Sequence, residues 1–202
     1  EYYNLIGRFN NGLQRQMYSY YDTTGKCIIP DKIYRMEAWR FFPSDFSEGL
    51  AVYPVIKDLK WQINNDYDID YYMNQDNWTY KYIDIYGRIG IENSYDYAES
   101  FSENLAIAEK GRKRGIIDKT GNFLFYNNAV YGQYTEGVIG YYENKNNTFK
   151  YGFLDTEGNI AVQAKYDVIL KGFEDGLALV ELNHELMYIC LLYTSPSPRD
   201  RQ

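Results

Sequence analysis

Short alternations of apolar and polar residues fill this chain. Apolar residues flank the pattern Asp-x-x-Gly in four places, and a second alternation, beginning with Leu or Val, follows each of them later in the chain. A period of 3.6 residues persists nowhere over three helical turns. The pattern therefore predicts an all-β chain of short strands joined by tight turns.

The first recurring phrase is the Asp-x-x-Gly pattern, which we name the Asp turn. Its carboxylate can accept hydrogen bonds from backbone amides two residues on, and its glycine takes a positive φ without steric cost. With apolar residues on both sides, the phrase predicts a β-hairpin whose register the turn fixes. The defining residues are Asp22 and Gly25, Asp84 and Gly87, Asp118 and Gly121, and Asp155 and Gly158.

The second phrase, which we name the acidic turn, has an aromatic residue and, two positions later, an acidic residue followed by Gly or Asn. Asn104 stands where the other copies carry glycine, and asparagine is the residue that best tolerates left-handed backbone after glycine. The phrase predicts a tight turn leading into a strand. Its turn residues are Gly49, Asn104, Gly137 and Gly176.

The two phrases recur together, so the chain is a repeat array. The steps between the glycines of the Asp turns are 62, 34 and 37 residues, and spacings of roughly 20–50 residues are typical of solenoids, propellers and arrays. The long first step contains residues 56–77, which match neither phrase and are interpreted as an insertion or a decayed partial repeat. We predict the end of a truncated repeat over residues 1–16 and an array over 17–183, with repeats at about 17–55, 78–109, 111–144 and 148–183.

The fold expected from this organisation is a set of tandem antiparallel β-hairpins, in an open array or an incomplete propeller-like assembly. The 24 tyrosines among 202 residues suit half-buried strands. A net charge of −7 argues against a nucleic-acid partner. The chain contains no run of about 18 apolar residues, so its sequence predicts no membrane span. Two cysteines are too few for a disulfide framework.

The two ends of the chain depart from the repeats. Residues 190–202 contain Ser-Pro-Ser-Pro and resemble translated read-through of a sequencing adapter; we expect a non-native tail, with a disordered linker as the alternative. The chain starts at Glu1 within the pattern, without an initiator methionine, so we expect both ends to be cut. Localisation is left open, an extracytoplasmic or cell-surface position in a bacterium being one hypothesis.

The paired phrases resemble the WG (also called KWG) repeat family of bacterial proteins, over about residues 17–183. The best matching segments are Gly25–Pro30, Phe46–Val52, Gly152–Asp155 and Ala164–Asp167. At the position where the family pattern has Trp, this chain has Tyr18, Tyr80, Arg114 and Tyr151, and Gly follows only as Gly115 and Gly152. The resemblance implies a binding or scaffolding repeat with no known catalytic activity, often found beside other domains.

No reactive constellation is evident, and we expect neither catalysis nor a cofactor or metal. His184 is the single histidine, and the run Asp66–Asp70 lacks the Gly and Glu that a calcium loop requires. The basic cluster Lys110–Arg114 is interpreted as a hairpin tip. The acidic residues of the acidic turns recur along a repeat axis, whereas glycoside hydrolysis needs two carboxyls across one cleft. They are Glu48, Glu103, Glu136 and Asp175.

The sequence therefore favours a non-enzymatic module for protein binding or scaffolding. Two alternatives remain open, a cell-surface polysaccharide-binding array and the accessory repeat region of a larger enzyme. Most aromatic residues are expected to pack between repeats, which bury one another's faces. Trp39 and Trp61 lie in non-repeating segments and are the predicted ligand contacts.

Overall fold

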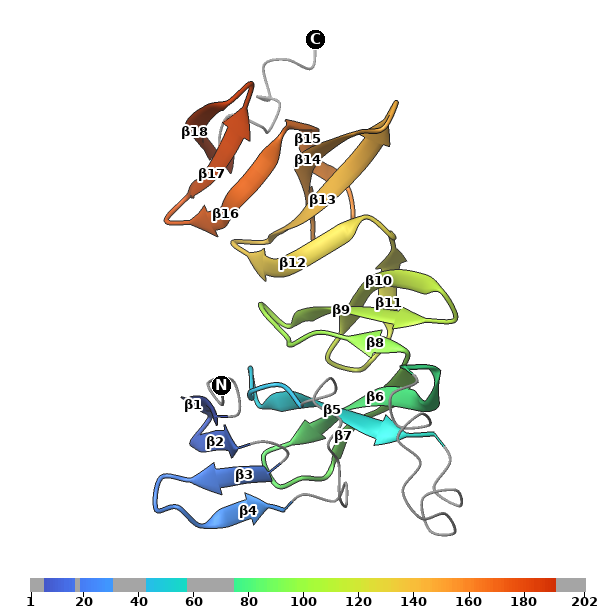
Figure 1. Ribbon diagram of the computed structural model, residues 1–202, viewed down its shortest axis with the longest axis vertical. Coiled ribbons are helices and arrows are strands. Elements are labelled where there is room, and N and C mark those ends of the chain that lie inside the picture. Colours follow the sequence, from blue (N-terminus) through green and yellow to red (C-terminus); the bar gives the residue numbers. More distant parts are fainter. Residues whose placement is uncertain (1–5, 17–18, 31–42, 58–74, 192–202) are drawn as a thin grey trace. The chain divides into compact units, whose positions relative to one another are not determined.

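The computed structural model describes residues 6–16, 19–30, 43–57 and 75–191 (Figure 1). Within these ranges the chain forms β-strands and one short 3-10 helix, η1 (Gln75–Asn77). The strand pairs are antiparallel, and none of these sheets closes into a barrel. The predicted all-β class and its tandem antiparallel hairpins are confirmed.

The described strands form five small sheets, each a meander in chain order. The first sheet contains β1 (Ile6–Asn10), β2 (Leu13–Gln16), β3 (Ser19–Asp22) and β4 (Cys27–Ile29). The second contains β5 (Leu50–Ile56), β6 (Trp78–Asp84) and β7 (Ile89–Tyr95). The third contains β8 (Tyr97–Ala98), β9 (Leu105–Lys110), β10 (Lys113–Asp118) and β11 (Phe123–Tyr126).

The last two sheets belong to the second of two compact units into which the chain divides, and the first two sheets belong to the other unit. The fourth sheet contains β12 (Val130–Thr135), β13 (Val138–Lys145), β14 (Thr148–Asp155) and β15 (Ile160–Tyr166). The fifth contains β16 (Val168–Glu174), β17 (Leu177–Leu182) and β18 (Glu185–Cys190).

Each sheet takes its strands from two neighbouring sequence repeats. In the fourth sheet, β12 and β13 flank one acidic turn, whereas β14 and β15 flank the Asp turn of the next repeat. The first sheet follows the same plan, because β1 and β2 flank a turn at Asn11 and Gly12, with φ of 52° and 79°. Residues 9–13 are thus a further copy of the acidic turn, which the sequence comparison did not identify.

The Asp turns have the geometry expected from their residues. At the first, Gly25 has φ of 83° and donates its backbone N–H to the Asp22 carbonyl at 3.0 Å. Asp22 Oδ1 accepts the backbone N–H groups of Thr24 and Lys26 at 2.9 and 3.0 Å. Asp84 and Asp155 bind the corresponding amides in the same way. The side chain thus closes the turn and sets the register of the strands that leave it.

The Asp22 carboxyl gives a prediction about pH. The Thr24 hydroxyl donates to Asp22 Oδ1 at 2.6 Å and, with the amides of the turn, lowers the pKa of Asp22 below its ordinary value. The lowered pKa stabilises the fold above the unfolded-state pKa, and this stabilisation is lost as the pH falls through the folded-state pKa. In Thr24→Val we expect the pKa of Asp22 to rise, as measured by NMR titration of its carboxyl carbon. An unchanged titration midpoint of Asp22 would contradict the role given to the Thr24 hydroxyl.

At three places an aromatic pair packs neighbouring sheets face to face. The aromatic residue two positions before the Asp turn contacts the aromatic residue of the following acidic turn. Ring centroids are 4.8 Å apart for Tyr20 and Phe46, 4.8 Å for Tyr82 and Phe101, and 4.9 Å for Phe153 and Phe173. All six side chains are at most 2% exposed. These pairs explain why aromatic residues occupy both phrases.

The two faces of a sheet therefore have distinct roles. We call the face that packs on the following sheet the leading face and the other the trailing face. In the second unit, Val138, Phe153 and Val162 on the leading face of the fourth sheet share one core with trailing-face residues of the fifth sheet. Those residues are Phe173, Ala178 and Val180.

Repeats differ in length at the hairpin between the strand that follows an acidic turn and the strand that leads to the next Asp turn. Two-residue turns join β9 to β10, β13 to β14 and β17 to β18. In the second sheet β5 pairs with β6 along its whole length, from Leu50 opposite Asp84 to Ile56 opposite Trp78. The additional residues, 57–77, thus enter at a hairpin tip, and residues 58–74 lie outside the described ranges.

Candidate functional site

The acidic turns are two-residue hairpin turns in which both central residues have positive φ. Ser47 and Leu50 exchange both backbone hydrogen bonds, at 2.9 and 3.0 Å. Such turns prefer Asn, Asp or Gly, and a larger side chain in the left-handed region costs about 1 kcal/mol. The first central residue nevertheless has φ of 51° to 55° at Glu48, Glu103, Glu136 and Asp175. An acidic residue at this strained position needs a compensating interaction.

For Glu103 and Glu136 the compensation is a hydrogen bond that the carboxylate accepts from the backbone of the next acidic turn. Glu103 accepts the backbone N–H groups of Glu136 and Gly137 at 2.6 and 2.7 Å. Glu136 in turn accepts the N–H of Gly176 at 3.1 and 3.0 Å. In the first unit, Asn11 Oδ1 accepts the N–H of Gly49 at 3.3 Å. These residues connect successive sheets, which gives Glu103 and Glu136 a structural role.

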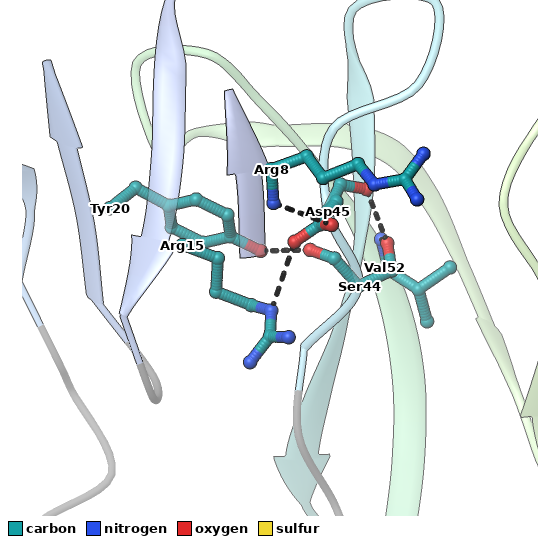
Figure 2. Close-up of polar contacts among 6 residues, drawn as sticks. All are labelled: Arg8, Arg15, Tyr20, Ser44, Asp45 and Val52. Carbon is teal, nitrogen blue, oxygen red and sulfur yellow. Dashed lines mark hydrogen bonds and ion pairs between the residues drawn. The ribbon is translucent and has the colours of Figure 1, made fainter. Parts of the chain in front are cut away.

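The first two sheets are also joined by a polar cluster around Asp45 (Figure 2). Its carboxylate accepts the Arg8 backbone N–H at 3.1 Å and pairs with Arg15 Nε at 3.2 Å, the Arg15 side chain being 12% exposed. The Tyr20 hydroxyl donates to the Ser44 carbonyl at 2.6 Å, and burial raises the pKa of this hydroxyl, so it stays protonated. These contacts make the cluster a joint between the two sheets.

The strongest candidate for ligand contact is an aromatic cluster on β12 and the β13–β14 hairpin, which we call the tip cluster. It consists of Tyr131, Tyr142, Phe149 and Tyr151. Tyr131 contacts Tyr151 edge to face at 5.6 Å, and Tyr142 contacts Phe149 edge to face at 5.4 Å. The register places Tyr142 opposite Tyr151 and Asn144 opposite Phe149, all on the leading face.

The tip cluster extends beyond what the inter-sheet core uses. Strands β13 and β14 have eight residues each, whereas β9, β10, β17 and β18 have six. Phe149 lies in the additional length and is 47% exposed. An aromatic side chain held by its neighbours and open to solvent is typical of a contact residue at a protein interface.

Tyr131 forms the floor of the tip cluster and gives a second prediction. Its ring lies over Gly140, where a Cβ atom would be 2.9 Å from Cζ, and its hydroxyl is buried with no hydrogen-bond partner in the described part of the chain. Because an unpaired buried hydroxyl costs roughly 1–3 kcal/mol, Tyr131→Phe should leave the denaturation midpoint unchanged or raise it. In Tyr82→Phe, which loses a 2.7 Å bond to the Glu99 carbonyl, the midpoint should fall. A fall in the denaturation midpoint of Tyr131→Phe as large as that of Tyr82→Phe would contradict this prediction.

The residues proposed from sequence lie elsewhere. Trp39 and Trp61, and the run Asp66–Asp70, lie outside the described residues. Trp78 is 1% exposed and belongs to the core. His184 occupies the β17–β18 turn with its side chain 99% exposed, and Gly111 and Arg112 form the β9–β10 turn, as the hairpin interpretation of the basic cluster requires.

Sequence reasoning missed the tip cluster, although a signal was present. Phe149 and Tyr151 alternate along one run, but Tyr131 and Tyr142 come from two other strands, so strand length and facing register are needed to bring the four rings together. In the ranges that the structure covers, no group of three or more His, Cys, Asp or Glu side chains could hold a metal ion. No helix within those ranges has the length and apolarity to cross a membrane.

Comparison with known families agrees with this geometry. A family model described as WG containing repeat matches residues 82–113 and 151–183. These two segments are WG-containing repeats. Each matched segment contains one Asp turn and the acidic turn that follows it. No curated protein and no solved structure matches the chain.

The family pattern explains how the tip cluster is positioned. Tyr151 occupies the position that gives WG repeats their Trp, and Tyr80 at the equivalent place in the second sheet is a half-buried ring that contacts Tyr97 at 6.4 Å. Gly152 follows, where a Cβ atom would lie 2.3 Å from the Val162 carbonyl oxygen. The glycine therefore lets β15 approach closely, and the preceding aromatic ring is presented on the opposite, leading face.

Proposed function

We propose that this WG-repeat array is a non-enzymatic module that binds another protein through the tip cluster. The observation that carries the proposal is Phe149, an aromatic side chain 47% exposed at the end of a hairpin longer than the repeat core requires. Tyr142, which itself packs against Tyr151, holds it in place, so little side-chain entropy would be lost on binding. Two of the four repeated acidic residues, Glu103 and Glu136, accept hydrogen bonds that join sheets.

A protein partner fits the cluster better than a polysaccharide. Sugar rings stack on aromatic rings with one open face, whereas the rings here meet edge to face, at 83° for Tyr131 and Tyr151 and 71° for Tyr142 and Phe149. The edge of one ring thus covers the face of another.

The test is selection of a displayed peptide library on the intact chain, followed by binding measurements on variants. We expect peptides whose affinity falls at least about tenfold in Phe149→Ser, since loss of a central interface aromatic costs about 2 kcal/mol or more. Leu124→Ser is the matched control, because Leu124 is 50% exposed and lies outside the tip cluster. It should bind the peptides as the natural chain does.

A glycan array probed with the same three proteins separates the alternative. Glycan binding that Phe149→Ser abolishes, without any selected peptide, would replace the protein partner with a polysaccharide. Peptides that bind Phe149→Ser and the natural chain equally would show that the tip cluster is not the contact surface.

A further inference from the structure

An aspartate joins the hairpin of the tip cluster to the next sheet. Asp167 lies between β15 and β16 and directly follows Tyr166, which pairs in register with Tyr151 of the tip cluster. The backbone N–H of Asp167 donates to the Glu181 carbonyl at 2.8 Å. Its side-chain Oδ2 accepts the backbone N–H of Asn183, in the β17–β18 turn, at 2.7 Å. The fifth sheet therefore holds Asp167 through both its backbone and its carboxylate.

The other carboxylate oxygen of Asp167 contacts the strand that carries the tip cluster. Oδ1 accepts a hydrogen bond from the Lys150 ammonium, and this ion pair, followed by the Asn183 amide, lowers the pKa of Asp167. Lys150 lies between Phe149 and Tyr151 on β14. Because side chains alternate along a strand, Lys150 points to the trailing face while both rings point to the leading face. The ion pair thus holds, from the opposite face, the segment of β14 that presents Phe149.

Asp96 has a similar place between the second and third sheets. It follows Tyr95, donates its backbone N–H to the Glu109 carbonyl at 2.8 Å, and accepts the Gly111 N–H of the β9–β10 turn at 2.8 Å. Its carboxylate pairs with Lys57 at 3.4 Å, and Lys57 follows β5 instead of lying on β6. The bond from such an aspartate to the next hairpin turn therefore recurs.

The cation differs between the two places. The residue of β6 equivalent to Lys150 is Thr79, whose hydroxyl donates to the Tyr95 carbonyl at 2.9 Å. Of the two aspartates, only Asp167 pairs with a cation on the strand that carries an exposed aromatic ring. The contact with Lys150 is thus an addition to the recurring bond, and it is found where the tip cluster lies.

We propose that Asp167 is a positioning residue for the tip cluster, which acts through Lys150 to hold Phe149 in the conformation that a partner binds. This role presupposes the proposed function of the tip cluster. Strands β13 and β14 extend beyond the core shared with the fifth sheet, so a contact outside that core keeps their end ordered. An end that is already ordered loses less conformational entropy on binding.

The binding test uses the intact chain and the peptides whose affinity depends on Phe149. In Asp167→Asn the side-chain oxygen can still accept the Asn183 N–H, but the charge that attracts Lys150 is lost. We expect the affinity to fall at least about fivefold, an ordinary size for coupling between two sites. Lys150→Met should bind as weakly as Asp167→Asn, whereas Lys150→Arg, which keeps the cation, should bind as the natural chain does. Asp96→Asn is the matched control and should also bind normally.

A second measurement needs no partner. Amide hydrogen exchange over residues 143–150 of the free chain should quicken in Asp167→Asn and keep its natural rate in Asp96→Asn. Circular dichroism verifies that each variant is folded. If no selected peptide depends on Phe149, the proposed function fails, and hydrogen exchange still decides whether Asp167 orders the hairpin.

Three results would overturn the positioning role. The first is natural peptide affinity in Asp167→Asn. The second is an equal loss of affinity in Asp167→Asn and Asp96→Asn, which would indicate a general loss of stability. The third is unchanged hydrogen exchange over residues 143–150 in Asp167→Asn.

Discussion

Replacement of Gly121 by alanine is expected to lower the stability of the first unit by about 2–5 kcal/mol. The glycine has φ of 84°, and alanine there costs of order 1–2 kcal/mol. The added Cβ atom would also lie 2.5 Å from Ile91 Cγ2 and 2.8 Å from the Tyr95 hydroxyl. Overpacking of a filled site costs a further 1–3 kcal/mol or so. The shift of the urea midpoint measures the sum.

Gly25 is the matched control for this prediction. It has the same place in an Asp turn and φ of 83°, but a Cβ atom there meets nothing within 4 Å. Gly25→Ala should therefore show the backbone cost alone, about 1–2 kcal/mol. Equal shifts in the two variants would mean that the glycine of the Asp turn is needed for its φ only and that its contact with the preceding repeat has no energetic weight.

Glu103→Gly and Asp175→Gly are expected to have opposite effects on stability. Both substitutions relieve a left-handed backbone at a residue with a Cβ atom, worth about 1 kcal/mol. Glu103→Gly also removes two charge-assisted bonds, at 2.6 and 2.7 Å, each contributing about 1.5–3 kcal/mol. The first variant should therefore lose about 2–5 kcal/mol on balance, whereas the second should be neutral or more stable.

Thermal and urea unfolding of both variants, compared with the natural chain, gives the measurement. If Glu103→Gly were as stable as Asp175→Gly, the bonds between acidic turns would contribute nothing beyond what water supplies to the same amides. The recurrence of acidic residues at a strained position would then lack a physical reason in stability.

Local turn chemistry made much of the fold predictable. The Asp turns follow from Asp and Gly three residues apart, because the carboxylate and the positive φ act within four residues of chain. Asn104 has φ of 65°, which its alignment with glycines had indicated. These features depend only on residues that are close in sequence, so they can be predicted from the sequence alone.

Features that depend on distant residues were not predictable. Nothing local shows that a sheet combines halves of two repeats, since strand pairing across the acidic turn and across the following hairpin is decided by which faces can be buried together. The copy of the acidic turn at residues 9–13 was missed because Asn10 and Asn11 replace the usual Ser and Glu. The tip cluster could be identified only from the register of β13 with β14, which the spacing of apolar residues in the sequence does not predict.

The second sheet shows that the hairpin tips and the stack can vary independently. Its β5–β6 hairpin has many residues where the other sheets have two, yet Gly87 still packs against Ile29 of the first sheet, with a Cβ position 3.1 Å from Ile29 Cγ2. A WG array can thus gain or lose long segments at these tips while its contacts between sheets are kept. New recognition sequences can arise at these tips, or be grafted there by design, without changing the contacts between sheets.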